Sequence, residues 1–227
     1  MKNLVTPKSG SESELGVRAR RSAERRAAIM DAALDLFAER GFAATRMEDV
    51  AARARVAKGT LYLHFADKQA LFEGIVRLAV GPRIAALSQI DVRAIVSVRD
   101  VIEAMALPSI AELTASRYAA IPRLLIAEGA RFPRLAEFYH AEIIQPGKAV
   151  MRRLMARAIE TGEIAGDALT HFPQLLVAPV LMGVVWQGLF QALEPLDIES
   201  MLKAWLDLVF VGPPRADPPP IARRPRE

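Results

Sequence analysis

Hydrophobic positions between residues 47 and 65 follow helical spacing in two short stretches. In the first stretch, apolar residues recur every three or four positions and therefore share one helical face: Met47, Val50, Ala51 and Ala54. In the second, Leu61 and Phe65 share a face, and most of the other side chains are polar or aromatic. The connection between them is long enough only for a tight corner. This pattern predicts a helix-turn-helix.

Residues that favour helix ends flank these stretches. Thr45, with Glu48 three residues later, has the spacing of a capping box, in which each side chain satisfies the other's free backbone amide. A helix over residues 22–41 is predicted before it. After it, Asp67 is expected to cap a fourth helix that ends at Gly81.

Beyond residue 82, proline punctuates a series of helical patterns. Six further helices are predicted at 98–118, 122–129, 133–144, 147–161, 169–193 and 198–211. The helix at 169–193 is apolar around nearly its whole circumference, and the last has a broad apolar face, so both must be covered. We expect a second copy of the chain to cover them in a four-helix bundle. The residues expected at this homodimer interface are Leu181, Val184, Val185, Leu189, Leu202, Trp205, Leu206 and Val209.

Charge is concentrated in the first third of the chain. Residues 1–68 carry 13 Lys and Arg against 9 Asp and Glu, whereas residues 69–227 carry 17 of each sign. The whole excess of +4 therefore accompanies the helix-turn-helix, as a polyanionic partner would require.

Composition supports an all-α fold of about nine helices, because Ala and Leu are frequent, aromatic residues make up 6%, and no strand-like alternation is evident. We expect two domains: a three-helix DNA-binding domain at 22–68 and a larger ligand-binding and dimerisation domain at 69–211. The flanking segments 1–21, a basic arm, and 212–227 are expected to be disordered. Cysteine is absent, which excludes disulfides and fits a reducing, cytoplasmic setting.

The helix-turn-helix resembles the TetR/AcrR family of bacterial transcriptional regulators. The resemblance is carried by A-L-D-L-F-A-E-R-G-F, T-R-M-E-D-V-A, V-A-K-G-T-L-Y-L-H-F and D-K-Q-A-L-F within residues 27–72. A later stretch, L-L-I-A-E-G-A-R-F-P-R-L-A-E-F-Y-H, resembles the C-terminal domains of the AefR-like branch.

The resemblance implies a set of DNA contacts. Thr45 and Arg46 would meet phosphate, and Lys68 would hold the DNA backbone from the fourth helix. The recognition helix would be lined by Lys58, Gly59, Thr60, Tyr62 and His64.

Two positions depart from the family pattern. Arg55 stands where the family usually has glycine in the turn, and Ala57 stands where Ser or Thr usually caps the recognition helix. We expect Arg55 to adopt positive φ at a cost of on the order of 1 kcal/mol. A contact between its charge and phosphate would offset this cost. Ala57 has no side-chain oxygen to cap the recognition helix, and the absence of such a cap costs about 1 kcal/mol of stability.

The resemblance implies a ligand-responsive dimeric regulator, of a kind that is most often a repressor. Such a protein binds a palindromic double-stranded operator and is released from it by a small hydrophobic or aromatic effector. No cofactor or membrane partner is expected. Candidate pocket residues, each of which core packing would also explain, are Met105, Phe132, Phe138, Tyr139, His140, Met151 and Trp186.

Three alternatives to a DNA-binding regulator are an enzyme, a membrane protein and a helical adaptor. The three histidines lie far apart and no catalytic motif is found, so no enzymatic activity is predicted. Residues 168–193 contain no charged side chain, but prolines and glycines interrupt them, which favours a buried or interface helix over a membrane span. A helical ligand-binding or adaptor protein without a specific operator is the remaining alternative.

Overall fold

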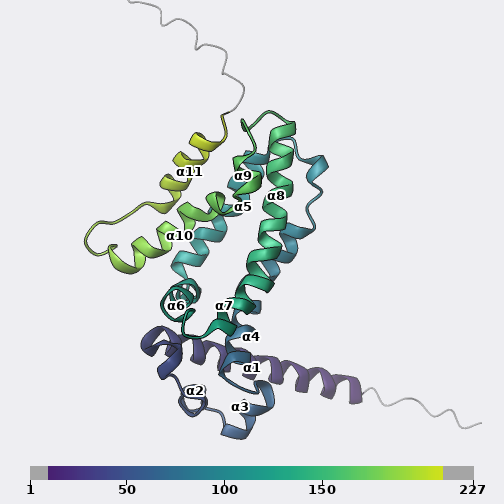
Figure 1. Ribbon diagram of the computed structural model, residues 1–227. Helices are drawn as coiled ribbons and strands as arrows, with labels where there is room; N and C mark the ends of the chain where they lie inside the picture. Colours follow the sequence, from purple (N-terminus) through teal and green to yellow (C-terminus); the bar gives the residue numbers. More distant parts are fainter. Residues whose placement is uncertain (1–9, 212–227) are drawn as a thin grey trace, which may run out of the picture.

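The computed structural model describes residues 10–211, which form helices and connecting turns, as the all-α prediction requires (Figure 1). A head is formed by α1 (Gly10–Ala44), α2 (Met47–Arg53), α3 (Lys58–His64) and the start of α4 (Lys68–Ser88). The body contains η1 (Val92–Ala94), α5 (Val98–Ala115), η2 (Arg117–Ala119), α6 (Ala120–Glu128), α7 (Pro133–Tyr139), the π-helix η3 (His140–Ile144), α8 (Gln145–Glu160), α9 (Ala168–His171), α10 (Gln174–Leu189) and α11 (Ile198–Val209).

Helix α4 joins the head to the body. It packs against α1 in the head and against α7 and α8 in the body. In Figure 1, α2 and α3 lie at the foot of the molecule, α1 crosses above them, and α10 and α11 lie on the side of the body away from α8. The head is therefore attached to the body through α4 and through the packing of α6 on α1.

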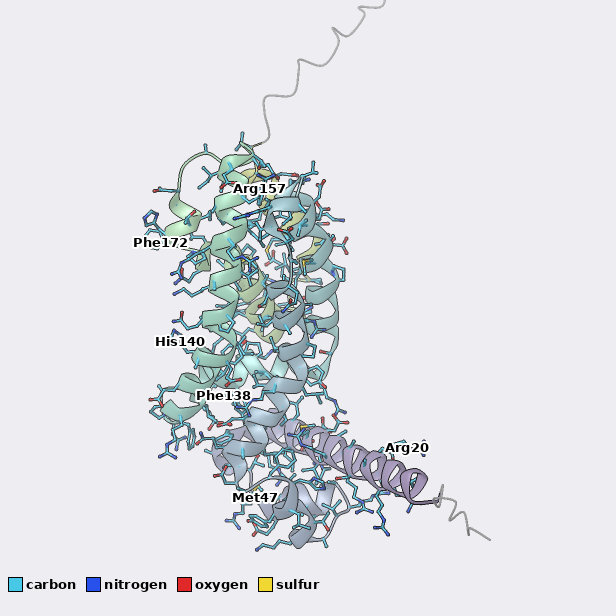
Figure 2. All side chains as sticks on the ribbon, turned by 90° about the vertical axis from the view of Figure 1, so that its right-hand side faces the viewer. Arg20, Met47, Phe138, His140, Arg157 and Phe172 are labelled. Carbon is cyan, nitrogen blue, oxygen red and sulfur yellow. The ribbon has the colours of Figure 1, made fainter. Side chains whose placement is uncertain are left out.

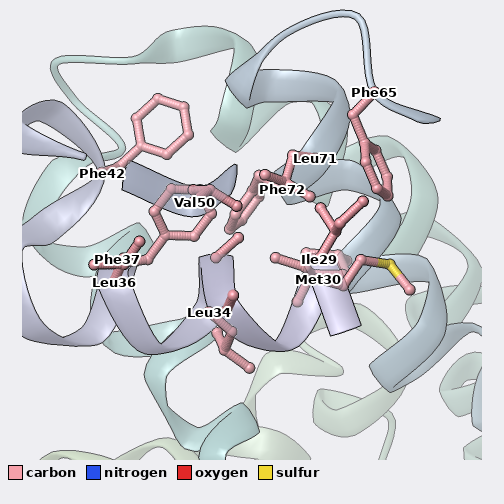
Figure 3. Close-up of a cluster of buried hydrophobic side chains, with 14 of the residues drawn as sticks. Ile29, Met30, Leu34, Leu36, Phe37, Phe42, Val50, Phe65, Leu71 and Phe72 are labelled. Atoms are coloured by element: carbon pink, nitrogen blue, oxygen red, sulfur yellow. The ribbon is translucent and has the colours of Figure 1, made fainter. Parts of the chain in front are cut away.

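The core of the head extends into the body. Ile29, Leu36, Leu61 and Phe72 are buried in one cluster, part of which is drawn in Figure 3. The same cluster includes residues of α6, α7 and η3, namely Ile121, Leu124, Leu135 and Ile143. A second cluster lies farther from the head and is built around Leu154, Met155, Leu202 and Leu206. Head and body thus share one core, while the far part of the body has its own.

Helix α1 is longer than the sequence predicted. It begins at Gly10 rather than at Ser22, so the described part of the predicted disordered arm, from residue 10 to residue 21, is helical. The predicted end at Gly41 is confirmed, because Gly41 has φ 81° and breaks the helix before one further turn to Ala44. The remaining segments predicted to be disordered, 1–9 and 212–227, lie outside the described residues.

Prolines interrupt fewer helices than predicted. Helix α4 continues through Pro82 to Ser88 instead of ending at Gly81, and Pro179 lies within α10. The predicted helices at 133–144 and 147–161 follow one another without a loop, through η3. An interior proline costs about 3 kcal/mol, but Ile75, Val76 and Ala79 are buried before Pro82, and Leu87 packs against the second cluster after it. The predicted helix at 169–193 does break, and α9 and α10 are its two parts.

Candidate nucleic-acid interface and apolar cavity

The corner between α2 and α3 has the strained conformation that the sequence predicted. Arg55 has φ 55°, whereas the other described residues with positive φ are glycines. The amide of Val56 donates to the carbonyl oxygen of Ala51 at 3.0 Å, which closes the turn. Helix α3 then begins at Ala57 with no side-chain cap, also as predicted. Burial of Leu61 and Phe65 therefore holds α3 in place.

The outer face of α3 is exposed and has no evident role in the fold. Lys58, Gly59 and Tyr62 are exposed, and Thr60 and His64 are half-buried. A Cβ atom added to Gly59 would meet no other atom of the structure within 4 Å, so packing within the chain does not require glycine there. Sequence reasoning missed Leu63, which is 86% exposed on the same helix. The sequence signal for Leu63 is a large apolar residue on the polar face of a predicted recognition helix, where core packing does not require one.

A surface ion pair holds Lys58. Its Nζ lies 2.6 Å from the Oε1 of Glu48 on α2 and 5.9 Å from the centre of the Tyr62 ring. The hydrogen bond between the two side chains raises the pKa of Lys58 and lowers the pKa of Glu48. Both therefore stay charged near neutral pH. The spacing predicts a different role for Glu48, as the partner of Thr45 in a capping box.

Thr45 lies inside the head rather than at its surface. It is 2% exposed, and its hydroxyl donates to the carbonyl oxygens of Gly41 (2.8 Å) and Leu36 (3.2 Å). Helix α2 instead begins at Arg46, which is exposed and makes no side-chain cap. The capping box is wrong, because the Thr45 side chain satisfies the end of α1 instead. Of the two residues predicted to meet phosphate, Arg46 is the one with an exposed side chain.

Lys68 is likewise committed to the backbone. Its Nζ donates to the carbonyl oxygens of Phe42 (2.5 Å), Ala43 (3.1 Å) and Thr45 (2.9 Å) and lies 4.5 Å from the centre of the Phe42 ring. Burial lowers the pKa of Lys68, against the opposing effect of the Glu128 carboxylate. All three ammonium protons are used. Lys68 therefore fixes the segment between α1 and α2, and its predicted contact with the DNA backbone stays a prediction.

Glu128, at the end of α6, connects the body to the same segment. Its carboxylate accepts hydrogen bonds from the backbone amides of Phe42 (2.5 Å) and Ala43 (2.8 Å). Gly41 makes room for it, since a Cβ atom there would lie 2.3 Å from Oε1 of Glu128. Sequence reasoning did not single out Glu128, because no local pattern shows that α6 ends against α1.

The body contains an apolar cavity of about 460 Å³ between α4, α6, α7 and α10. Its lining includes Val80, Ile121, Leu125, Ile144, Val180 and Val184. Two predicted pocket residues, Tyr139 and His140, also line it, and burial raises the pKa of the Tyr139 hydroxyl. The size and lining are those of a small-molecule site for an apolar compound.

The other predicted pocket residues lie elsewhere. Met105 and Met151 line a second cavity of about 350 Å³ between α4, α5 and α8. Phe132 packs edge-on against Phe42 at a centroid distance of 4.9 Å. Phe138, labelled in Figure 2, lies beneath the Arg77 guanidinium at 4.7 Å, and the Nε1 of Trp186 donates to the carbonyl oxygen of Glu194. These three were expected in the effector pocket and instead serve packing.

Helices α10 and α11 leave a wide apolar face in solvent, but several of the predicted interface residues are not on it. Val184, Leu202 and Leu206 are buried within the chain, and Val185, Trp205 and Val209 are half-buried. Leu181 and Leu189 are exposed as predicted. The exposed apolar side chains of this region are Leu175, Val177, Leu181, Met182, Leu189, Phe190, Leu193, Leu208 and Val211. The helical spacing of apolar residues shows which positions avoid water. It does not show which of them pack against a neighbouring helix of the same chain and which remain exposed.

Other kinds of site find little support. Within residues 10–211, no three His, Asp or Glu side chains come together in an arrangement that could hold a metal ion. Glu137 and His140 lie one turn apart, at the end of α7 and the start of η3, but belong to no such group. Of the helices described, none combines the length and the hydropathy needed to cross a bilayer.

Comparison with known proteins agrees with this architecture. Residues 29–75 match the model for bacterial regulatory proteins of the tetR family, and residues 96–205 match a tetracyclin repressor-like C-terminal domain. The chain is 30% identical over 137 residues to the HTH-type transcriptional regulator YdeS of Bacillus subtilis, covering 60% of this chain and 66% of that protein. It is 29% identical over 167 residues to the HTH-type transcriptional regulator UidR of Escherichia coli, covering 70% and 79%.

A solved structure of similar fold is that of SmeT in complex with triclosan, with a TM-score of 0.69 and 24% identity. The match covers 88% of this chain and all of that one. Another structure describes SmeT as the repressor of the Stenotrophomonas maltophilia multidrug efflux pump SmeDEF. The matched family models include both the head with its helix-turn-helix and most of the helical body, and the chain belongs to the TetR family of bacterial helix-turn-helix transcriptional regulators.

Proposed function

We propose that the protein is a dimeric repressor that binds a palindromic DNA operator through α3 and is released by a small hydrophobic or aromatic effector. The outer face of α3 carries the DNA-binding part of this proposal. Lys58 can donate to guanine, Thr60 can contact a base edge, and Gly59 allows close approach of the backbone to DNA. The apolar side chain of Leu63 suits a thymine methyl group. Arg46 and Arg55, both exposed, would contact the flanking phosphates.

The dimer is supported by the apolar face of α10 and α11. Exposed patches of this kind are unusual on monomeric proteins and mark interaction sites. A two-fold pairing through this face would join two bodies and set the spacing of the two heads. Two recognition helices would then read half-sites about 10–10.5 base pairs apart, or a multiple of that distance.

Effector response is supported by the position of the cavity. Leu125 lines the cavity on α6, and Glu128, one turn later, holds the amides of Phe42 and Ala43 in the head. Helix α4 also borders the cavity and enters the head. An effector that binds better to a shifted α6 would thereby favour a different head position, and the coupling free energy would appear as release from DNA. The presence of triclosan in the SmeT structure supports an apolar aromatic effector.

The test of DNA binding is selection from a random pool of duplexes at low salt. We expect enrichment of a palindrome, and binding that weakens by about 10³–10⁵ between 50 and 200 mM salt for 6–10 phosphate contacts. A pool that shows no enrichment by the folded protein would contradict the proposal.

The test of coupling uses Glu128→Ala, with the exposed Glu137→Ala on α7 as the matched control. Losing the two amide contacts should change both DNA affinity and its response to triclosan, used as the probe, whereas the control should behave as the parent. Equal behaviour of the two variants would exclude this route of coupling. A parent chain that keeps its operator at saturating triclosan would exclude only this compound class.

A further inference from the structure

The first turns of α1 extend beyond the head. Every residue from 16 to 26 is exposed, and burial begins only at Ile29. Figures 1 and 2 show this part of α1 projecting from the head, with Arg20 near its free end. A helical segment that is exposed on all sides contributes no packing to the core. The segment is therefore available for contact with another molecule.

The arginines of this segment fall into two sets. Arg18, Arg21 and Arg25 are spaced three and four residues apart and so form a row along one face. Within the described residues this row has no hydrogen-bond or ion-pair partner. Arg20 lies outside the row and pairs with Glu24 at 3.3 Å. Like charges one turn apart destabilise a helix, so the row is unfavourable until an anion binds it.

The row leads directly to the recognition helix. Arg26, the next residue after Arg25, places its guanidinium 5.0 Å from the centre of the ring of Phe65, the residue at which α3 ends. The three arginines extend about 10 Å along the helix axis, at 1.5 Å per residue. That length is close to three steps between successive phosphates on one DNA strand, at about 3.4 Å of rise each.

We propose that Arg18, Arg21 and Arg25 bind phosphates of the DNA that flanks the operator, outside the base pairs read by α3. The inference rests on the proposed function, since it needs a head bound to DNA. A membrane surface is disfavoured because α1 has no broad apolar face here: between residues 10 and 28 its large apolar residues are Leu15 and Val17, among arginines and glutamates. The partner is therefore the polyanion that α3 already contacts.

The test compares two duplexes that carry the selected palindrome. One is trimmed to the palindrome, and the other has about ten further base pairs of random sequence on each side, roughly one helical turn. We expect the parent chain to bind the long duplex at least tenfold more tightly. R18A/R21A/R25A should lose that advantage and keep its affinity for the short duplex. The slope of log affinity against log salt on the long duplex should fall by about 0.9 for each arginine that holds a phosphate.

The matched controls are R21A and R20A, which remove the same charge from within the row and from outside it. R21A should reduce the advantage of the long duplex, and R20A should not. Equal binding of both duplexes by the parent, or equal losses in R20A and R21A, would overturn the inference. A parent that binds neither duplex would overturn the proposed function instead. Circular dichroism should show that the variants are folded, because all four positions are exposed.

Discussion

Two surfaces of the molecule are left in solvent and differ in chemistry. The outer face of α3 presents Lys58, Gly59 and Tyr62 with Leu63 among them, whereas α10 and α11 present a run of large apolar side chains. A polar face is stable in water and can bind and release a charged partner. An apolar face of this extent is costly to leave uncovered and suits a lasting contact. The contrast supports the proposed division, in which α3 binds DNA reversibly and α10 and α11 form a lasting contact with a second copy.

The same two regions differ in how their helices are held. Helices α2 and α3 begin without a side-chain cap. In the body, Ser97 and Asp197 cap α5 and α11, and Glu163 adds two further contacts at the start of α5. Helices α6 to α10 of the body also begin without a side-chain cap, so among its α-helices the local stabilisation is confined to α5 and α11, while α2 and α3 depend on the shared core.

The largest predicted effect follows from placing charge on the apolar face. L189E/L208E introduces carboxylates at side chains that are 67% and 78% exposed, so the fold of each chain should be kept. Sedimentation should show monomers where the parent forms dimers. Operator affinity should fall by about 10²–10⁴, because the second head no longer binds as part of the same molecule. If L189E/L208E remains dimeric, the dimer interface does not lie on this face of α10 and α11.

The second prediction separates the two surfaces. L63E introduces one carboxylate at the equally exposed apolar position on α3. We expect it to remain dimeric and to lose about tenfold or more in operator affinity, because the carboxylate would face phosphates and base edges. Gel shift and sedimentation of L63E beside L189E/L208E provide the comparison. If L63E disturbs dimerisation, or leaves DNA binding unchanged, the two surfaces do not have separate roles.

The third prediction concerns the capping of α5. Glu163 accepts from the amides of Val98 (2.8 Å) and Arg99 (2.9 Å) and from the hydroxyl of Thr161 (2.7 Å). Burial raises the pKa of Glu163, but the hydrogen bonds together outweigh it, and the pKa lies below its usual range. Since the folded state has the lower pKa, this stabilisation is full above the unfolded pKa of about 4.3 and is lost as pH falls through the folded value.

E163Q should therefore reduce the free energy of unfolding by about 1 kcal/mol at pH 7, the value of a lost cap. The difference from the parent should shrink as the pH is lowered from about 5 to 3. Urea unfolding at several pH values measures it, with E137Q as the control. A loss that stays constant across this range would mean that the charge of Glu163 is not what stabilises α5. DNA binding by the folded variant should be unchanged, unlike that of L63E.

Local signals in the sequence were sufficient for the helix-turn-helix. The period of Met47, Val50, Leu61 and Phe65 located both helices, and Arg55 was correctly expected at positive φ. The contacts that Thr45 and Lys68 make within the chain were not predicted, for one physical reason. Both side chains satisfy carbonyl oxygens at the end of α1, and nothing in their own neighbourhood shows that the chain doubles back there.

The body was harder to predict because tertiary packing overrides local breaks. Pro82 and Pro179 were read as helix ends or interruptions, yet both lie inside helices that the core holds on either side. The apolar pattern of α10 and α11 predicted an interface, and several large apolar side chains of this region are exposed, but the interface itself stays a prediction. It could not separate Leu202 and Leu206, which face α10 and the second core, from Leu208, which faces solvent.

The smallest predicted effect returns to the turn of the head. R55G should relieve the positive φ at Arg55, a gain of about 1–2 kcal/mol, while the greater freedom of glycine in the unfolded chain offsets about 0.5–1 kcal/mol. The net gain in stability should be about 0.5 kcal/mol, measured by urea unfolding. R55A is the control: it loses the same charge but keeps the strain, so it should not be stabilised. If Arg55 also contacts phosphate, both variants should lose operator affinity by a similar factor. The two variants would then separate the effect of Arg55 on the free energy of unfolding from its effect on DNA affinity.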